Sequence, residues 1–214
     1  MLKWWAMLPV FPLYVVPFPY HTVTVRIFEA HYKDMLVALR EGDGELVMGR
    51  IWRGHEVGGS AVPYRVGTLM KLQGVVPEGD SFQAEVLGLR RVYMRSFDHG
   101  AASYLQAQCE EYPDLVPGDG RREELLSIWK RYLQDVLGIP KETMSAWVES
   151  PLFQLPLPEL TLALSPFLRL PYSNLQFLLE SRDPNQRRDS LIKAMIRSIA
   201  GEKDEISNFP EERL

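Results

Sequence analysis

The chain has 214 residues, of which 46% are hydrophobic and 24% are charged, and its formal net charge is −4 at pH 7. This length and composition exclude a mainly disordered chain and allow one large globular domain or two small ones. The net negative charge counts against a general nucleic-acid-binding protein, which needs a basic face. The one cysteine, Cys109, excludes an intrachain disulfide and a thiolate metal site. Its alternating sequence context predicts an inward-facing strand position.

The N-terminal segment Leu8–Val16 is apolar and interrupted by prolines, which predicts a first strand at a sheet edge or a bulge. Lys3 and the apolar run behind it partly match a signal peptide, but the prolines and the missing small-residue cleavage site argue against one. No stretch reaches the roughly 18 apolar residues that a membrane-spanning helix needs. We therefore expect a cytoplasmic protein.

A second strand and a first helix follow. Alternating apolar residues predict a strand over Thr22–Ile27, and apolar residues at helical spacing predict a helix over Phe28–Arg40. Phe28 and Tyr32 lie one turn apart in this helix, so we expect both to pack inward. Glu29 would then lie at the helix N-terminus, where the helix dipole favours a carboxylate.

Short strands dominate the next part of the chain. The predicted strands are Glu45–Trp52, Val66–Leu72, Ser81–Leu87, Val92–Met94 and Ser103–Glu110. A glycine-rich loop, Arg53–Pro63, follows the first of them. The turn Pro77–Asp80 joins the second and third into a hairpin, and Gly88–Arg91 separates the third from the fourth. About seven short strands and one helix predict a small barrel or sandwich over residues 1–114.

The sequence changes character after the proline- and glycine-rich segment Tyr112–Gly120. The apolar period changes there from about 2 to about 3.6 residues, which predicts a helical subdomain over residues 121–200, followed by a charged tail, residues 201–214. Ser173 and Asp183 are predicted helix N-caps, the second with Pro184 in the first helical position. Three apolar stripes mark the expected helices: Leu125, Trp129, Tyr132, Leu133 and Val136; Met144, Trp147 and Val148; and Leu160, Ala163, Leu164, Phe167 and Leu168.

Several separated motifs form one pattern. They are Leu8-Pro9-Val10-Phe11-Pro12-Leu13, Val16-Pro17-Phe18-Pro19, Ile27-Phe28-Glu29 with Tyr32 and Met35, Val66-Gly67-Thr68, and the segment Leu178–Arg187 with its Asp183-Pro184 pair. This pattern resembles the N-terminal domain of Lon protease, and more closely the small stand-alone proteins built on that domain. Two positions depart from it. Tyr20 stands where the family has glycine, which tolerates positive φ as tyrosine does not, and His31 stands where it has arginine.

The resemblance implies an α+β fold, in which a PUA-like β-pseudobarrel of six strands is followed by a small α-helical subdomain. It also implies a binding protein for unfolded or exposed polypeptide segments, acting in protein quality control as an adaptor or a holdase with a protease or chaperone partner. The chain carries neither the phosphate-binding loop of an ATPase nor the motif of a serine–lysine peptidase, both of which full-length Lon needs. We therefore expect no enzymatic activity and no cofactor.

The candidate binding residues are aromatic side chains of the N-terminal segment together with the most specific trio of the motif. They are Phe11, Tyr14, Phe18, Tyr20, Phe28, Glu29 and Tyr32. Aromatic side chains left exposed near a sheet edge would suit an extended apolar chain that adds a strand to the sheet. The alternative is that these aromatics, with Trp4 and Trp5, fill the core, and the sequence leaves this choice open.

Two other functions are weighed against polypeptide binding. The strand segment with Arg90, Arg91, Tyr93 and Arg95 is basic and aromatic, which would suit RNA, although the acidic total argues against it. A cleft between the two subdomains could hold a small molecule or a hydrolase site, but no residue constellation supports a reaction.

We expect no metal site. The four histidines are scattered along the chain, and only His55-Glu56 offers two adjacent candidate ligands. Adjacent residues of a strand point to opposite faces, and a zinc site needs three or four converging ligands. The acidic pair Glu110-Glu111 is better explained by a solvated face than by acid–base catalysis.

Overall fold

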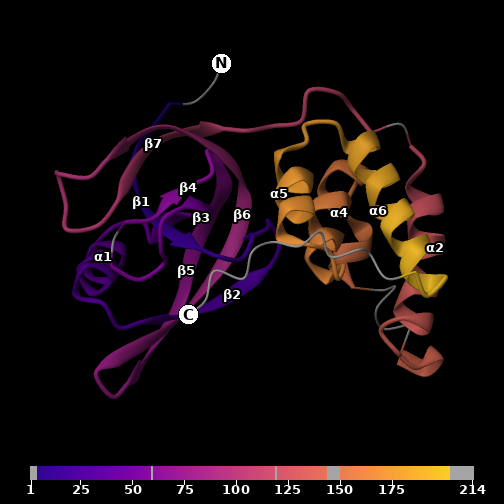
Figure 1. The fold of residues 1–214 in the computed structure, drawn as a ribbon, viewed down its shortest axis with the longest axis horizontal. Coiled ribbons are helices and arrows are strands. Elements are labelled where there is room, and N and C mark those ends of the chain that lie inside the picture. Colours follow the sequence, from indigo (N-terminus) through magenta and orange to yellow (C-terminus); the bar gives the residue numbers. More distant parts are fainter. Residues whose placement is uncertain (1–3, 59, 119, 144–149, 203–214) are drawn as a thin grey trace. The chain divides into compact units, whose positions relative to one another are not determined.

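The computed structural model describes residues 4–58, 60–118, 120–143 and 150–202, with the side chains from Met7 onward. The chain divides into two compact units, Met1–Pro113 and Asp114–Leu214. The first contains strands and one helix and is called the barrel unit. The second contains helices and is called the helical unit (Figure 1).

Most strands of the barrel unit close into a ring. Its elements are β1 (Trp4–Leu13), β2 (Thr22–Ile27), α1 (Ala30–Glu41), β3 (Glu45–Arg53), β4 (Val62–Pro63), β5 (Val66–Glu78), β6 (Ser81–Asp98) and β7 (Gln106–Glu111). The strand order β1-β7-β6-β5-β3 returns to β1, because β1 also pairs with β3 in parallel. Of the other two strands, β2 pairs with β6 and β4 pairs with β3. The mixed fold with a large, mainly antiparallel sheet was predicted.

The strand β6 is longer than predicted. It runs from Ser81 to Asp98, whereas the sequence predicted two strands separated by Gly88–Arg91. The register shifts at this point, since Leu69 pairs with Arg90 and Met70 with Gly88, so the predicted break is a β-bulge. Gly88 is required there, because a Cβ atom would lie 2.3 Å from the carbonyl oxygen of Phe18. Glycine therefore permits a close backbone approach and does not end the strand.

Both faces of the sheet are buried. On one face a cluster from the strands packs against α1, with Met35, Leu36 and Leu39 from the helix. The other face carries a second cluster that includes Val10, Val47, Leu69, Val92, Met94, Ala107 and Cys109. Cys109 is fully buried, as its alternating context predicted, and burial raises the pKa of its thiol to about 12.

The helix α1 begins two residues later than predicted. It spans Ala30–Glu41 with Glu29 as its N-cap residue, so Phe28 precedes the helix. The prediction that Phe28 packs inward was wrong, because its side chain is 51% exposed. Tyr32, which lies within the helix, is buried as expected.

The helical unit is built from short helices. They are α2 (Arg122–Asp135), η1 (Lys141–Thr143), η2 (Pro151–Gln154), α4 (Leu157–Leu164), η3 (Ser165–Phe167), α5 (Tyr172–Glu180) and α6 (Pro184–Ile199). The stripe on α2 is confirmed, with Trp129 and Tyr132 fully buried. The predicted stripe of Met144, Trp147 and Val148 lies outside the described residues. The prediction for Ser173 was wrong, because α5 begins at Tyr172 after Pro171 and has no side-chain cap.

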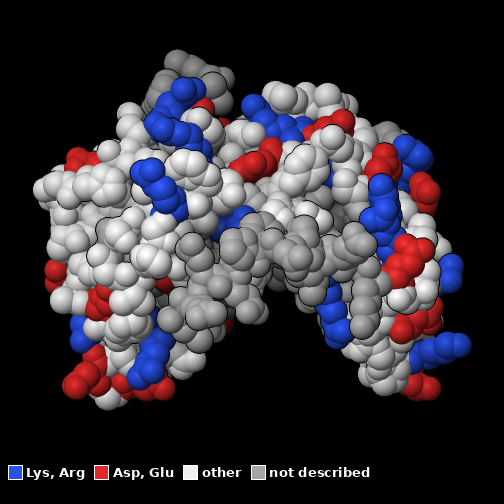
Figure 2. Space-filling model, viewed as in Figure 1, with Lys and Arg blue, Asp and Glu red and all other residues white. Residues whose placement is uncertain are grey.

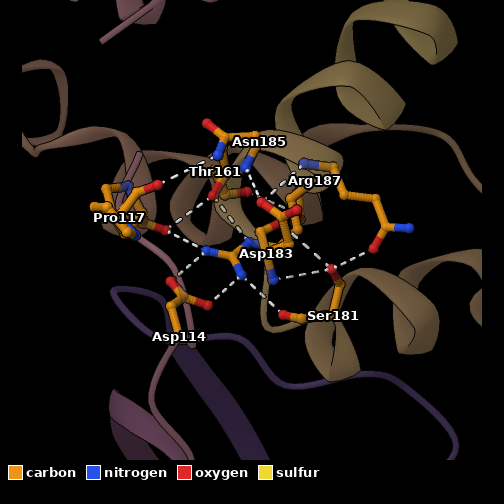
Figure 3. A network of polar contacts seen from close by, with 10 residues as sticks. Asp114, Pro117, Thr161, Ser181, Asp183, Asn185 and Arg187 are labelled. Carbon is orange, nitrogen blue, oxygen red and sulfur yellow. Dashed lines mark hydrogen bonds and ion pairs between the residues drawn. The ribbon is translucent and has the colours of Figure 1, made fainter. Parts of the chain in front are cut away.

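Asp183 caps α6 as predicted, and the same segment supplies a fully buried arginine (Figure 3). The carboxylate of Asp183 accepts hydrogen bonds from the backbone N–H groups of Asn185 and Gln186. One turn later, Arg187 forms a paired contact with Asp114, at 2.6 and 2.8 Å. It also donates to the hydroxyl of Thr161 and to two backbone carbonyls, those of Ser181 and Pro158. The Asp-Pro-x-x-Arg pattern thus fastens α4, α5 and α6 to the first residue of the unit.

Candidate functional site

The seven predicted binding residues divide into buried and exposed side chains. Phe11, Phe18 and Tyr32 are 5%, 1% and 6% exposed, whereas Tyr14, Tyr20 and Phe28 are 48%, 38% and 51% exposed. Glu29 lies between these groups, with 15% of its side chain exposed. Some of the predicted aromatic side chains therefore belong to the core and others to the surface. Tyr14, Tyr20 and Phe28 are the aromatic residues of this set that a partner can reach. The side chains of Trp4 and Trp5 lie outside the described part of the chain.

Tyr20 occupies a conformation that normally favours glycine. Its φ is +68°, at the position where the sequence pattern has glycine. A non-glycine residue in this left-handed region costs roughly 1 kcal/mol or more. The turn is held by β6, because the N–H of Tyr20 donates to Gly88 and the N–H of Gly88 donates to His21, both at 2.8 Å. The turn leaves the tyrosine side chain partly exposed.

Tyr20 and Phe28 flank a strand that has a free edge. The strand β2 pairs with β6 from Thr22, opposite Leu87, to Ile27, opposite Phe82. Within the described residues no other strand pairs with β2. The outer edge of such a strand presents N–H and C=O groups that an extended chain can pair with. This edge of β2, with which no described strand pairs, therefore has an exposed aromatic residue at each end.

Glu29 connects the start of α1 to the glycine-rich loop between β3 and β4. It is the N-cap residue by position, as expected, but its side chain makes no capping hydrogen bond. Its Oε2 atom instead accepts a hydrogen bond of 2.9 Å from the N–H of Gly58. From the same loop, Glu56 accepts a hydrogen bond from the backbone N–H of Tyr14. Two carboxylates thus tie the loop to the segments that directly follow β1 and β2.

A pocket of about 340 Å³ opens beside Glu29. Four segments of the barrel unit line it: β1, the start of α1, the loop after β3, and the loop between β6 and β7. The lining residues are Pro12, Glu29, His31, Tyr32, Gly58, Ala61, His99, Ser103, Tyr104 and Leu105. The hydroxyl of Ser103 donates to Asp34 of α1, at 2.7 Å, which ties the last of these segments to the helix. Two of the predicted residues, Glu29 and Tyr32, therefore meet in one concave site.

The electrostatics of the pocket are acidic. Burial, followed by the charges of Glu29 and Glu56, raises the pKa of Tyr32 to about 12. Burial also raises the pKa of Glu56; the hydrogen bond from Tyr14 opposes this shift, and the charge of Glu29 adds to it. No lysine or arginine is part of the described lining. The buried Nε2 atom of His31 has no hydrogen-bond partner in the described structure and lies 4.0 Å from Oε2 of Glu29.

Several residues of this site belong to no motif that could have marked them in the sequence. Glu56 was considered only as a metal ligand, and His31, His99 and Ser103 belong to no motif with fixed spacing. His99 and Ser103 lie in the loop before β7 and reach α1 only through the closure of the barrel. The departure of His31 from the usual arginine was the one available clue. It marks the imidazole that now lines an acidic pocket.

The basic strand segment considered for RNA binding is largely neutralised within the barrel unit. Arg91 is only 5% exposed, and its guanidinium lies 5.4 Å from the ring centre of Tyr112. The acidic pair of β7 contacts the two neighbouring arginines: Arg95 to Glu110 at 2.6 Å, and Arg90 to Glu111 at 3.8 Å. Figure 2 shows positive and negative side chains interspersed on the face in view. These pairs also account for Glu110-Glu111 better than a solvated face alone.

The described residues form neither a metal-binding group nor a membrane-spanning helix. The described residues contain no group of three or more histidine, cysteine, aspartate or glutamate side chains placed to hold a metal ion. Among the same residues, no helix has the length and apolar character needed to cross a membrane.

The comparisons with known proteins agree with the geometry. The family model of the ATP-dependent protease La (LON) substrate-binding domain matches residues 7–197. The fold is similar to that of a Lon N-terminal domain protein from Xanthomonas campestris, at 19% identity and a TM-score of 0.66, covering 88% of this chain and 98% of that one. The N-terminal domain of Mycobacterium avium complex Lon protease gives 18% identity and a TM-score of 0.64, with 89% and 98% covered. No curated protein is significantly similar. The match over nearly its whole length shows that this chain belongs to the family of the Lon substrate-binding domain.

Proposed function

We propose that this chain is a non-catalytic binding protein that takes unfolded or exposed polypeptide segments by strand addition to β2. The observation that carries the proposal is the edge of β2 with which no described strand pairs, between two exposed aromatic residues, Tyr20 and Phe28. Main-chain hydrogen bonds along such an edge give affinity without a fixed sequence, and aromatic side chains at its ends add apolar contact. This combination suits a partner recognised by its exposed backbone and apolar residues.

Family membership supports the substrate class, since the matched domain is described as substrate-binding. In this proposal the chain holds polypeptide segments or delivers them to a protease or chaperone. RNA binding is the weaker alternative, because Arg90, Arg91 and Arg95 already contact acidic or aromatic groups of the barrel unit. A hydrolase is also weaker, because Ser103 in the pocket donates its hydroxyl proton to Asp34. A serine nucleophile is typically activated by a histidine, and among the described residues the hydroxyl of Ser103 donates to Asp34 and to no histidine.

The test is fluorescence anisotropy of the purified chain with three labelled ligands: an unfolded polypeptide, the same protein folded, and a mixed single-stranded RNA. We expect saturable binding of the unfolded chain alone that persists at about 0.5 M salt, because a phosphate-driven contact weakens steeply with salt. Salt-sensitive binding of RNA would contradict the proposal and favour an RNA-binding function for the barrel unit. The absence of any binding would contradict it.

Matched variants locate the contact. Phe28→Ala should weaken binding about tenfold, as for an aromatic anchor at an interface. Phe177→Ala is the control, because Phe177 lies in the helical unit and is equally exposed, 50% against 51%. A client peptide N-methylated at alternate residues should also lose affinity, since it cannot donate the main-chain hydrogen bonds. Equal binding by both alanine variants, or by methylated and plain peptides, would place the contact elsewhere.

A further inference from the structure

The pocket beside Glu29 lies at the end of the strand proposed to receive a polypeptide. Glu29 follows Ile27, the last residue of β2, by two positions, so their Cα atoms are at most about 7.6 Å apart. A chain paired along β2 therefore ends within side-chain reach of the pocket. We propose that this pocket takes the side chain of a lysine or arginine of the bound polypeptide. This inference rests on the proposed function and names a preference within it.

The walls of the pocket match the two parts of such a side chain. Pro12, Ala61, Tyr104 and Leu105 supply apolar and aromatic surface, against which an aliphatic stem can pack. The carboxylate of Glu29 supplies the charge for the cationic head. The volume of about 340 Å³ lies within the range of ligand pockets and is ample for one long side chain.

The spacing between Glu29 and His31 leaves room for a donor. Their Oε2 and Nε2 atoms are 4.0 Å apart, too far for a direct hydrogen bond. A nitrogen placed between them can approach each to about 2.9 Å, the usual N–H···O distance. An ammonium or guanidinium group carries several N–H donors, so it can donate to Oε2 of Glu29 and also to Nε2 of His31 when the imidazole is neutral with its proton on Nδ1. It would satisfy the buried Nε2 atom of His31, for which the described structure supplies no partner.

The charges around the pocket favour a cation over an anion or a neutral group. Glu29 lies in the lining, Glu56 lies close enough to Glu29 and Tyr32 to influence both, and Asp34 accepts the hydroxyl of Ser103 at the rim. The described lining contains no lysine or arginine, and its two histidines, His31 and His99, offset these carboxylates only when they are protonated. An acidic peptide side chain would be repelled from the same place.

The experiment compares two client peptides that differ at one position, arginine or norleucine, in anisotropy titrations against the whole chain. The wild-type chain should bind the arginine peptide about tenfold more tightly, as expected for hydrogen bonds to a charged group. Glu29→Gln should reduce this preference, measured as the ratio of the two peptide affinities, to about twofold or less. Glu41→Gln is the matched control, because this carboxylate lies at the exposed far end of α1.

The outcomes separate the two proposals. Equal binding of both peptides by the wild-type chain would overturn the cationic preference and leave strand addition intact. Binding of neither peptide would overturn both. A free lysine derivative with blocked backbone groups serves as the competitor. If it displaces the arginine peptide completely at low millimolar concentration, the pocket is a site for small cations and the inference about a polypeptide side chain fails.

Discussion

The two units treat their buried charged groups in opposite ways. In the helical unit, the guanidinium of Arg187 is fully buried, and its contacts with Asp114, Thr161 and two carbonyls use all five of its N–H donors (Figure 3). In the barrel unit, Glu29 and His31 face a pocket across 4.0 Å without bonding each other. A saturated cluster can only hold the fold together. An incomplete cluster at a pocket still has hydrogen bonds to give to a ligand.

The largest expected effect comes from breaking the saturated cluster. Arg187→Met removes both charged hydrogen bonds to Asp114 and the donors to the carbonyls of Ser181 and Pro158. Loss of one member of a buried ion pair costs about 3–5 kcal/mol. Amide hydrogen exchange should show the helical unit opening while the barrel unit stays protected. Lys193→Met, an exposed change on the same helix, is the control.

A second substitution sharpens this result. Adding Asp114→Leu to Arg187→Met removes the carboxylate that has lost its contact with Arg187 and should restore part of the lost stability, because a buried ion pair replaced by apolar groups is often nearly neutral. If Arg187→Met alone unfolds no more easily than the wild-type chain, the desolvation of the arginine offsets its contacts. The role assigned to the Asp-Pro-x-x-Arg pattern would then be wrong.

The next largest effect is expected at high pH and tests the raised pKa of Tyr32, which lines the acidic pocket of the barrel unit. The folded barrel unit favours the neutral form of Tyr32, whose pKa rises from the ordinary 10.0 to about 12. The contribution of this group to stability is therefore complete below pH 10 and is lost as the pH rises towards 12. It amounts to roughly 3 kcal/mol, at about 1.4 kcal/mol for each unit of pKa.

Thermal unfolding of the barrel unit between pH 9 and 11.5 measures the effect. Tyr32→Phe should make its Tm fall less steeply than in the wild-type chain. Tyr172→Phe, which removes an exposed tyrosine from the helical unit, should not change the slope. Cys109 also titrates late, with a pKa of about 12, so every variant carries Cys109→Ala. Parallel slopes for Tyr32→Phe and the wild type would show that burial and the nearby carboxylates do not raise the pKa of Tyr32 as described.

The sequence predicted local structure well where one segment decides it. Alternation placed β2 at Thr22–Ile27, and the Asp183-Pro184 pair marked the start of α6. The sequence-based prediction was wrong where a distant segment determines the structure, and at one helix boundary. Gly88 looked like a break because the close approach of Phe18 cannot be read from spacing, and Phe28 looked buried because the helix was started two residues early. The pocket escaped prediction for the same reason, since His99 and Ser103 meet α1 only after the barrel closes.

The smallest effect concerns the one described non-glycine residue with positive φ, Tyr20. Tyr20→Gly relieves the left-handed strain, of the order of 1 kcal/mol, but it also makes the unfolded chain more flexible, which costs roughly 0.4–1 kcal/mol. The net change in the free energy of unfolding should therefore stay within about 0.5 kcal/mol, measured by urea denaturation. Binding of an unfolded polypeptide should nevertheless weaken several-fold, because the exposed ring at the start of β2 is lost. Tyr20→Asn separates the loss of the ring from the backbone effect of glycine. Asparagine also lacks the ring, and it tolerates positive φ better than tyrosine. If Tyr20→Gly leaves binding intact, tyrosine stands at this glycine position without serving polypeptide recognition, and Phe28 alone would define the aromatic end of the edge.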